Sequence, residues 1–252
     1  MSEHGGRRYL SEVTDLMQRI LSEEAEPVQA VAEVLAEQIR ADRLVHVFGP
    51  GGHSNLAAQE VFFRAGGLMH ISAILDEGTL LSSGALRSMA MERTPGYGRI
   101  VIDNSGLGED DLILIVNSYG MNSAVIDSTL RAKELGATVV GVSSRQHAET
   151  IGAEHPARHP SKQNLHDLAD LFLDSLVPVG DAVIDLGDAV PPAGAVSTFA
   201  NAFLMNAIQV LTIERVLQDG TRPAVWTSGN APGGDEANAK LVDRFTGRIR
   251  NL

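Results

Sequence analysis

An uninterrupted run of five apolar residues, 112–116, constrains the fold of this chain more than any other stretch. Such a run is typical of a parallel strand that is buried on both faces. A polar turn at 117–123 follows, then a helical pattern over 124–135 and a second strand over 137–142. This order of strand, turn, helix and strand predicts an α/β domain built around a parallel sheet.

The turn 117–123 is the first candidate ligand site. It lies at the carboxyl end of a strand and at the start of a helix, where backbone N–H groups and the helix dipole favour anions or polar oxygens. In open parallel sheets, ligands bind outside the carboxyl ends of the strands. Asn117, Ser118, Asn122 and Ser123 can add side-chain donors. The alternative is that Asn122 or Ser123 only caps the helix.

A second, glycine-rich turn at 49–55 follows a strand predicted over 43–48. Its glycines allow the backbone to approach a ligand closely, and His53 and Ser54 supply polar side chains. The spacing is not a full dinucleotide fingerprint, and no clear acidic ribose ligand follows, so we discount NAD and expect no cofactor. Glu60 lies further along the next helix, either as a functional residue or facing solvent.

Composition excludes several classes of protein. With 20 basic and 32 acidic residues the net charge is −12, which argues against a nucleic-acid partner. The chain has no cysteine, so disulfides and zinc–thiolate sites are excluded. The histidines at 147, 155 and 159 are separated by prolines and carry no paired ligand motif, so we predict no metal site. No apolar run approaches the length of a membrane span, and we expect a cytoplasmic protein.

The remaining patterns predict one domain over residues 1–252. Its further helices are expected at 9–24, 27–40, 56–65, 79–93 and 196–217, and its further strands at 68–75, 171–176 and 181–186. The segment 99–107 is mixed, 146–164 reads as a polar linker, and the tail from 218 is either a surface arm or a wrap around a site. The helix 196–217 is apolar nearly all round. With the two leading helices, it predicts a homodimer or homotetramer.

Several stretches resemble the sugar isomerase (SIS) domain family. The similarity covers about 35–217, and it is carried by 47–54, 111–120 and 132–137. The chain also resembles an uncharacterised, phosphoheptose-isomerase-like bacterial subgroup, on the stretches 60–67, 164–170 and 233–236.

This resemblance implies a flavodoxin-like, three-layer αβα sandwich with a five-stranded parallel sheet. The core would span 35–217, with extra N-terminal helices at 7–40 and a C-terminal arm at 218–252. It implies a sugar or sugar-phosphate ligand, bound in the turn 117–123 and often between subunits. It also implies aldose–ketose isomerisation. The alternatives are a lyase or etherase acting on amino-sugar phosphates, or a sensor that binds a phosphosugar without chemistry.

Two departures from the family pattern bear on the substrate. The family's phosphate turn reads Ser-x-Ser-Gly-x-Ser/Thr, whereas this chain has Asn117, Tyr119 and Asn122 at the hydroxyl positions. Either backbone N–H groups hold the phosphate, together with Ser143, Ser144 and Arg145, or the substrate is not phosphorylated. The heptose isomerases also place a histidine on the late helix, and 199–217 contains none.

The implied reaction moves one proton between neighbouring carbons through an enediol, which requires a carboxylate or imidazole in contact with the carbon acid. Glu60 is the expected base, and His53 could open the sugar ring or donate to its carbonyl. His166 is a third candidate, with a packed helix residue as the alternative. The expected substrate-binding residues are Gly51, Gly52, Ser54, Asn55, Asn117, Ser118, Tyr119, Gly120, Asn122, Ser123, Ser143, Ser144 and Arg145.

Overall fold

Five parallel strands form the central sheet of the computed structural model, which describes residues 4–252; residues 1–3 of the predicted domain lie outside the described part. The strand order is β2-β1-β3-β4-β5. The strands are β1 (Val45–Phe48), β2 (Ile71–Ile74), β3 (Leu112–Val116), β4 (Thr138–Ser143) and β5 (Leu171–Asp174). The structure therefore confirms the predicted α/β fold with a five-stranded parallel sheet.

The order of the strands fixes where a ligand can bind. From β1, the chain first adds β2 on one side and then crosses to add β3, β4 and β5 on the other. The two crossovers leave in opposite directions, so a crevice opens at the carboxyl ends of β1 and β3. Both polar turns that the sequence singled out follow these two strands.

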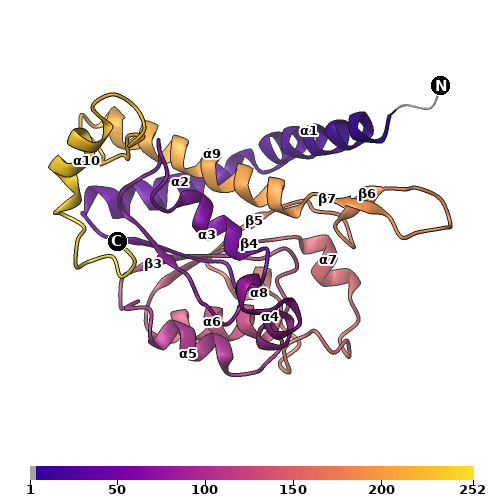
Figure 1. Cartoon of the computed structure of the whole chain (residues 1–252). Coiled ribbons are helices and arrows are strands. Elements are labelled where there is room, and N and C mark those ends of the chain that lie inside the picture. Colours follow the sequence, from indigo (N-terminus) through magenta and orange to yellow (C-terminus); the bar gives the residue numbers. More distant parts are fainter. Residues whose placement is uncertain (1–3) are drawn as a thin grey trace.

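Helices cover both faces of the sheet and make three layers (Figure 1). One apolar core lies under α1 (Gly5–Glu23), α2 (Ala25–Arg40), α3 (Asn55–Val61) and α9 (Ser197–Gln218). A second core lies on the opposite face, under α5 (Tyr97–Asp103), α6 (Ser123–Glu134) and α8 (Leu165–Leu168). The buried strand β3 contributes alternate residues to both cores, as its continuous apolar run predicts.

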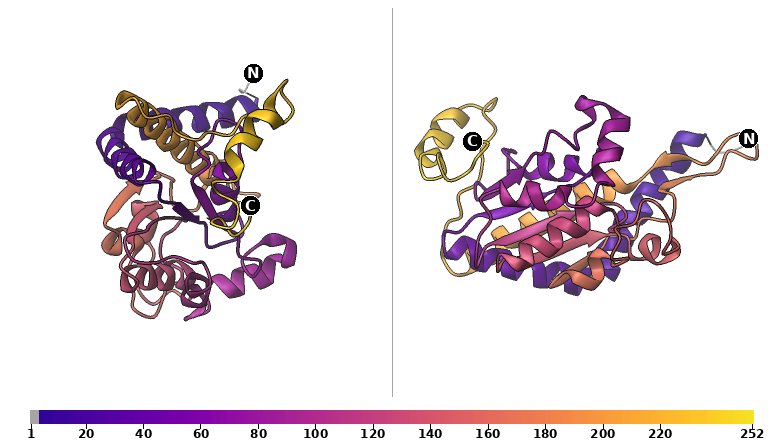
Figure 2. Two further views of the ribbon diagram at one scale, coloured as in Figure 1. Left: turned by 90° about the vertical axis from the view of Figure 1, so that its left-hand side faces the viewer. Right: turned by 90° about the horizontal axis from the view of Figure 1, so that it is seen from below.

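Two elements project from opposite ends of these layers. The hairpin of β6 (Ala182–Ile184) and β7 (Ala193–Ala195) extends beside the N-terminal part of α1 (Figure 1). The C-terminal segment with α10 (Gly234–Val242) lies at the other end of the sheet, as two further views show (Figure 2). In the part of the chain from residue 4 onward, no helix combines the length and apolarity that a membrane span needs.

The helix predicted over 79–93 is wrong as a continuous element. A 3₁₀ turn, η1 (Leu81–Ser83), comes first, and α4 (Ala85–Glu92) follows. Gly84 between them has a φ of 108°, a conformation that a helix cannot contain. The break changes the direction of the chain before α4, and α4 contacts α6.

Other boundaries also shift. The helix predicted over 56–65 ends at Val61, because Phe62 is extended and Phe63 has a φ of 51°. The strand predicted over 181–186 does not join the main sheet, since β6 pairs with β7 in an antiparallel hairpin. The mixed segment 99–107 includes most of α5, and the predicted polar linker 146–164 begins with most of α7 (Arg145–Thr150).

Candidate functional site

A cavity of about 290 Å³ lies at the carboxyl ends of β1 and β3, between the two polar turns. α4 contributes one wall, and the start of α9 with the loop before β6 contributes another. The residues that line the cavity are Gly52, His53, Ser54, Leu81, Ala85, Ser88, Met89, Glu92, Asn117, Ser118, Tyr119, Asn122, Asp181, Ala195, Ser197 and Thr198.

Asn117 holds the two turns together. Its side-chain Nδ2 donates to the carbonyl oxygen of Pro50 at 2.9 Å and to Ser54 Oγ at 3.2 Å. Its Oδ1 accepts the backbone N–H groups of Tyr119 and Gly120, both at 2.9 Å. The buried amide therefore fixes the distance between the turns and also satisfies two donors of its own turn.

Glu92 at the end of α4 is the carboxyl group that sequence reasoning missed. Its Oε1 accepts the backbone N–H of Gly52 at 2.9 Å, and its Oε2 accepts Asn122 Nδ2 at 3.2 Å. Burial raises the pKa of this carboxyl above the ordinary 4.5, although the bonds from Gly52 and Asn122 oppose that rise. A carboxyl with a raised pKa in a cleft has the properties of a general base or acid.

Asp181 is a second carboxyl that the sequence analysis did not assign to the site. It precedes β6, with a φ of 67°, and lies at the start of α9. Its Oδ1 accepts the backbone N–H groups of Val196 at 2.9 Å and Ser197 at 2.7 Å, and its Oδ2 accepts Ser197 Oγ at 2.7 Å. A carboxylate here satisfies donors at the helix N-terminus and interacts favourably with the helix dipole.

Tyr119 lies against the imidazole of His147. The two rings are stacked with their centroids 3.7 Å apart and an interplanar angle of 16°. Burial raises the pKa of the Tyr119 hydroxyl, and the negative charges of Asp181 and Glu92 raise it further. The hydroxyl therefore stays protonated at neutral pH and remains a hydrogen-bond donor.

The structure brings about half of the predicted site residues to this cavity. Gly51, Asn55 and Gly120 are predicted site residues that do not line the cavity. Asn55 Nδ2 donates to the carbonyl oxygen of Gly51 at 2.7 Å, and Gly120 packs against Ser143. Ser123 is a buried residue in the first turn of α6. The predicted residues that line the cavity are Gly52, His53, Ser54, Asn117, Ser118, Tyr119 and Asn122.

The predicted group Ser143, Ser144 and Arg145 is not at the cavity wall. Ser143 and Ser144 are fully buried, and Ser144 Oγ donates to the carbonyl oxygen of Val177 at 2.6 Å while it caps α7. The guanidinium of Arg145 lies 5.1 Å from the ring centroid of Phe172. Residues 143–145 lie at the carboxyl end of β4, and none of them lines the cavity.

His166 is also separate from the cavity. Its side chain is only 4% exposed, with Nε2 3.5 Å from Asp167 and 3.6 Å from Glu149. Its ring packs edge-on against Phe172. Burial lowers the pKa of His166, and the geometry is that of the packed helix residue considered as the alternative.

Glu60 lies in a smaller, neighbouring cavity of about 210 Å³. Its Oε1 accepts Asn206 Nδ2 at 3.2 Å and lies 3.3 Å from Arg64. The exposed His53 and the half-buried Thr198 line both this cavity and the larger one that contains Glu92. The two carboxyl groups, Glu60 and Glu92, therefore belong to adjacent pockets with His53 between them.

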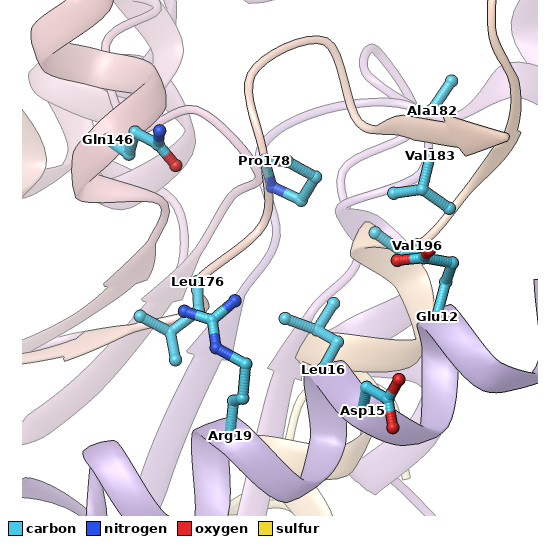
Figure 3. Close-up of a pocket in the computed structure, with 10 residues that line it drawn as sticks. All are labelled: Glu12, Asp15, Leu16, Arg19, Gln146, Leu176, Pro178, Ala182, Val183 and Val196. Atoms are coloured by element: carbon cyan, nitrogen blue, oxygen red, sulfur yellow. The ribbon is translucent and has the colours of Figure 1, made fainter. Parts of the chain in front are cut away.

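A cavity of about 380 Å³ lies elsewhere, between α1, the start of α7 and the loop after β5 (Figure 3). Glu12, Asp15 and Arg19 of α1 face it together with Leu176 and Pro178. None of the predicted site residues lines this cavity. Although it is larger, the two carboxyl groups that line it, Glu12 and Asp15, are exposed, and we place the candidate site in the crevice described above.

The histidines of the segment 146–164 have separate partners. His147 stacks on Tyr119, His155 Nδ1 accepts the backbone N–H of Ala157, and His159 Nε2 lies 3.2 Å from Asp127. Over residues 4–252, no three His, Asp or Glu side chains are grouped in a way that could hold a metal ion.

Comparisons with known proteins identify the family. The model of the SIS domain matches residues 8–144. A UPF0309 protein of Caldanaerobacter subterraneus subsp. tengcongensis is 33% identical over 247 residues, covering 97% of this chain and 98% of the relative. A UPF0309 protein of Halalkalibacterium halodurans is 32% identical over 241 residues, covering 96% and 94%.

A solved structure agrees in fold. The phosphoheptose isomerase GmhA of Neisseria gonorrhoeae superposes with a TM-score of 0.53 at 14% identity, covering 84% of this chain and 96% of that one. At this identity the likeness concerns the fold alone. The assignment rests on the family model and on the two relatives that match almost the whole chain. The chain belongs to the SIS-domain family.

Proposed function

We propose that this protein is an aldose–ketose isomerase acting on a sugar or sugar phosphate, with Glu92 as the base that moves the proton. The observation that carries the proposal is the partly buried carboxyl of Glu92, whose pKa is raised, in the crevice where the strand order reverses. Membership of the SIS-domain family and the phosphoheptose-isomerase-like fold support a carbohydrate ligand.

The chemistry requires a base that reaches the C–H bond beside the carbonyl. A base is most effective when its pKa approaches the working pH, and burial moves the pKa of Glu92 in that direction. The same carboxyl, once protonated, can return its proton to the neighbouring carbon. Its bonds to Gly52 and Asn122 hold it in one orientation for both steps.

Stabilisation of the enediolate oxygen requires a hydrogen-bond donor in the same cavity. The Tyr119 hydroxyl fits this role, because its raised pKa keeps it protonated and its stack on His147 fixes the ring. Ser118 supplies a second hydroxyl on the same turn. His53, which is exposed at the rim between the two pockets, is placed to assist opening of a sugar ring.

The test is exchange of hydrogen with solvent. Proton transfer through an enediol in D₂O introduces deuterium beside the carbonyl, which NMR detects for each sugar of a panel. Glu92→Gln should lower kcat by about 10²–10⁴-fold, the range that general base catalysis contributes. Glu60→Gln is the matched control, since it removes a carboxylate from the adjacent pocket.

The outcomes separate the hypotheses. If Glu60→Gln abolishes exchange and Glu92→Gln does not, the base is Glu60 and the isomerase proposal stands. If the wild-type protein binds a sugar but neither exchanges nor cleaves it, the protein is a sensor. Release of a leaving group without aldose–ketose interconversion would indicate a lyase or etherase.

A further inference from the structure

Several backbone donors beside this cavity already bond to oxygens of the protein itself. Asn117 Oδ1 accepts the N–H groups of Tyr119 and Gly120 in the turn after β3. Glu92 Oε1 accepts the N–H of Gly52 in the turn after β1. A phosphate has acceptor oxygens and depends on free N–H groups or cationic side chains.

The start of α9 is occupied in the same way. Asp181 Oδ1 accepts the N–H groups of Val196 and Ser197, at the helix end that faces the cavity. A carboxylate there satisfies these donors and also places a negative charge at the wall. An incoming phosphate would have to displace a bound carboxylate rather than fill an open site.

The charged residues that line the cavity also disfavour a phosphate. Glu92 and Asp181 both line the cavity, whereas no Lys or Arg does so among the residues that the structure describes. Arg145, the cation that the sequence analysis assigned to a phosphate, lies over Phe172 instead. Carboxylates at the wall of a cavity repel an anionic ligand.

The side chains that remain suit hydroxyl groups. Carboxylate oxygens of Glu92 and Asp181 accept from O–H donors, and the hydroxyls of Tyr119 and Ser118 can both donate and accept. Leu81 and Met89 add apolar surface on the α4 side, which can pack against the C–H face of a sugar.

We infer that the substrate of this cavity is a sugar without phosphate or any other anionic group. This inference rests on the proposed isomerase function and names its substrate class. It selects one of the two explanations that the altered turn sequence left open: the Asn117 amide joins the two turns and bonds Tyr119 and Gly120 instead of binding a phosphate.

The experiment compares matched pairs by thermal shift at equal concentration and neutral pH. The pairs are glucose, fructose, mannose and glucosamine with their 6-phosphates, and inorganic phosphate is tested alone. A ligand that binds the native state raises Tm by mass action. At least one free sugar should raise Tm, with a Kd at least about tenfold lower than that of its 6-phosphate, which corresponds to about 1.4 kcal/mol.

Two variants test why phosphate is excluded from the cavity. Asp181→Asn removes a charge while keeping an oxygen that can cap α9, and Asn117→Ser frees the N–H groups of Tyr119 and Gly120. Inorganic phosphate should not shift the Tm of the wild type, and it should shift the Tm of at least one variant. Asp181→Asn keeps the test informative if Asn117→Ser does not fold.

A 6-phosphate that stabilises the wild type more than its free sugar overturns the inference, and so does a panel in which no free sugar raises Tm. Failure of the isomerase proposal has a different signature. A free sugar that raises Tm but acquires no deuterium in D₂O contradicts isomerisation while leaving the substrate class in place.

Discussion

Glu92 Oε2 accepts a hydrogen bond from Asn122 Nδ2 at 3.2 Å, while Asn122 Oδ1 is buried without a partner among the described residues. A glutamine at position 92 could keep the bond from Gly52 and donate its own amide to Asn122 Oδ1 after a rotation of the Asn122 amide. Glu92→Gln should therefore retain the fold, because Gly52 and Asn122 can each keep a hydrogen bond to the glutamine.

The stability of Glu92→Gln tests this geometry. Burial raises the folded-state pKa of Glu92, so the favourable contribution of its protonated form is present below pH 4.5 and is lost as pH rises through the folded-state pKa. At pH 7 the variant, which has no charge to desolvate, should match or exceed the wild-type Tm. Thermal unfolding at pH 4 and pH 7 measures the change. A Tm lower than that of the wild type at pH 7 would mean that the charged form is stabilising.

The pH dependence of turnover follows from the same carboxyl. The base must be ionised to remove a proton, so activity should rise with pH through the pKa of Glu92 in the free enzyme. Since burial raises that pKa, the acidic limb of kcat/KM should lie above pH 4.5, the ordinary value. Rates between pH 4 and pH 8 locate the limb. A profile without an acidic limb in this range would argue against Glu92 as the base.

Gly49 is required because the glycine-rich turn 49–55 approaches the start of α3 closely. A Cβ at this position would lie 1.9 Å from the carbonyl oxygen of Ser54, which accepts the N–H of Ala57 at 3.1 Å and cannot move away freely. We expect Gly49→Ala to lower the free energy of unfolding by at least about 2 kcal/mol. Gly152→Ala is the control, since a Cβ there meets no atom within 4 Å. Urea unfolding of both variants should separate them, and equal midpoints would contradict the packing argument.

The sequence predicted those parts of the fold that depend on local patterns. The apolar run 112–116 is β3, and its turn does line the cavity, because a buried parallel strand and the polar residues at its end are both visible in the chain. Asn117 and Tyr119 were recognised as unusual members of that turn. Their partners were not, since the bond from Asn117 to Pro50 joins residues that are distant in sequence.

The parts that sequence reasoning missed depend on tertiary packing. Glu92 belongs to no motif, and its place results from the break at Gly84 and from the contact of α4 with α6. Asp181 reaches the cavity because β6 leaves the sheet rather than joining it. Arg145 was assigned to the site from its position after β4, but the direction of a side chain at a strand end is not encoded in local spacing.

Assembly remains a prediction. Several apolar side chains are exposed on the projecting α1 and on α9, with exposed fractions of 67% for Leu10, 48% for Phe199 and 55% for Val210. Burial of such surface favours association. We expect a dimer or tetramer, and light scattering at micromolar concentration should give about two or four times the chain mass of 26.8 kDa. A mass equal to that of one chain would contradict it.

Asp42 attaches the C-terminal segment to the amino end of the sheet. Its carboxylate lies 3.1 Å from Nε2 of the buried His70, 2.9 Å from Arg244 and 3.2 Å from Arg248, and Phe245 packs between these groups. Asp42 has a φ of 53°, a conformation that asparagine also adopts readily. Asp42→Asn therefore removes the charge without a new backbone strain.

We expect Asp42→Asn to lower the free energy of unfolding by about 1–2 kcal/mol, because three charge-assisted contacts weaken together and the site is half exposed. Limited proteolysis should cut the segment 218–252 faster in this variant, since the arm opens more often. Asp243→Asn is the control, because it removes the same charge from an exposed position on the same segment. Equal cleavage rates in the two variants would show that apolar packing around Phe245, rather than the Asp42 contacts, holds the arm.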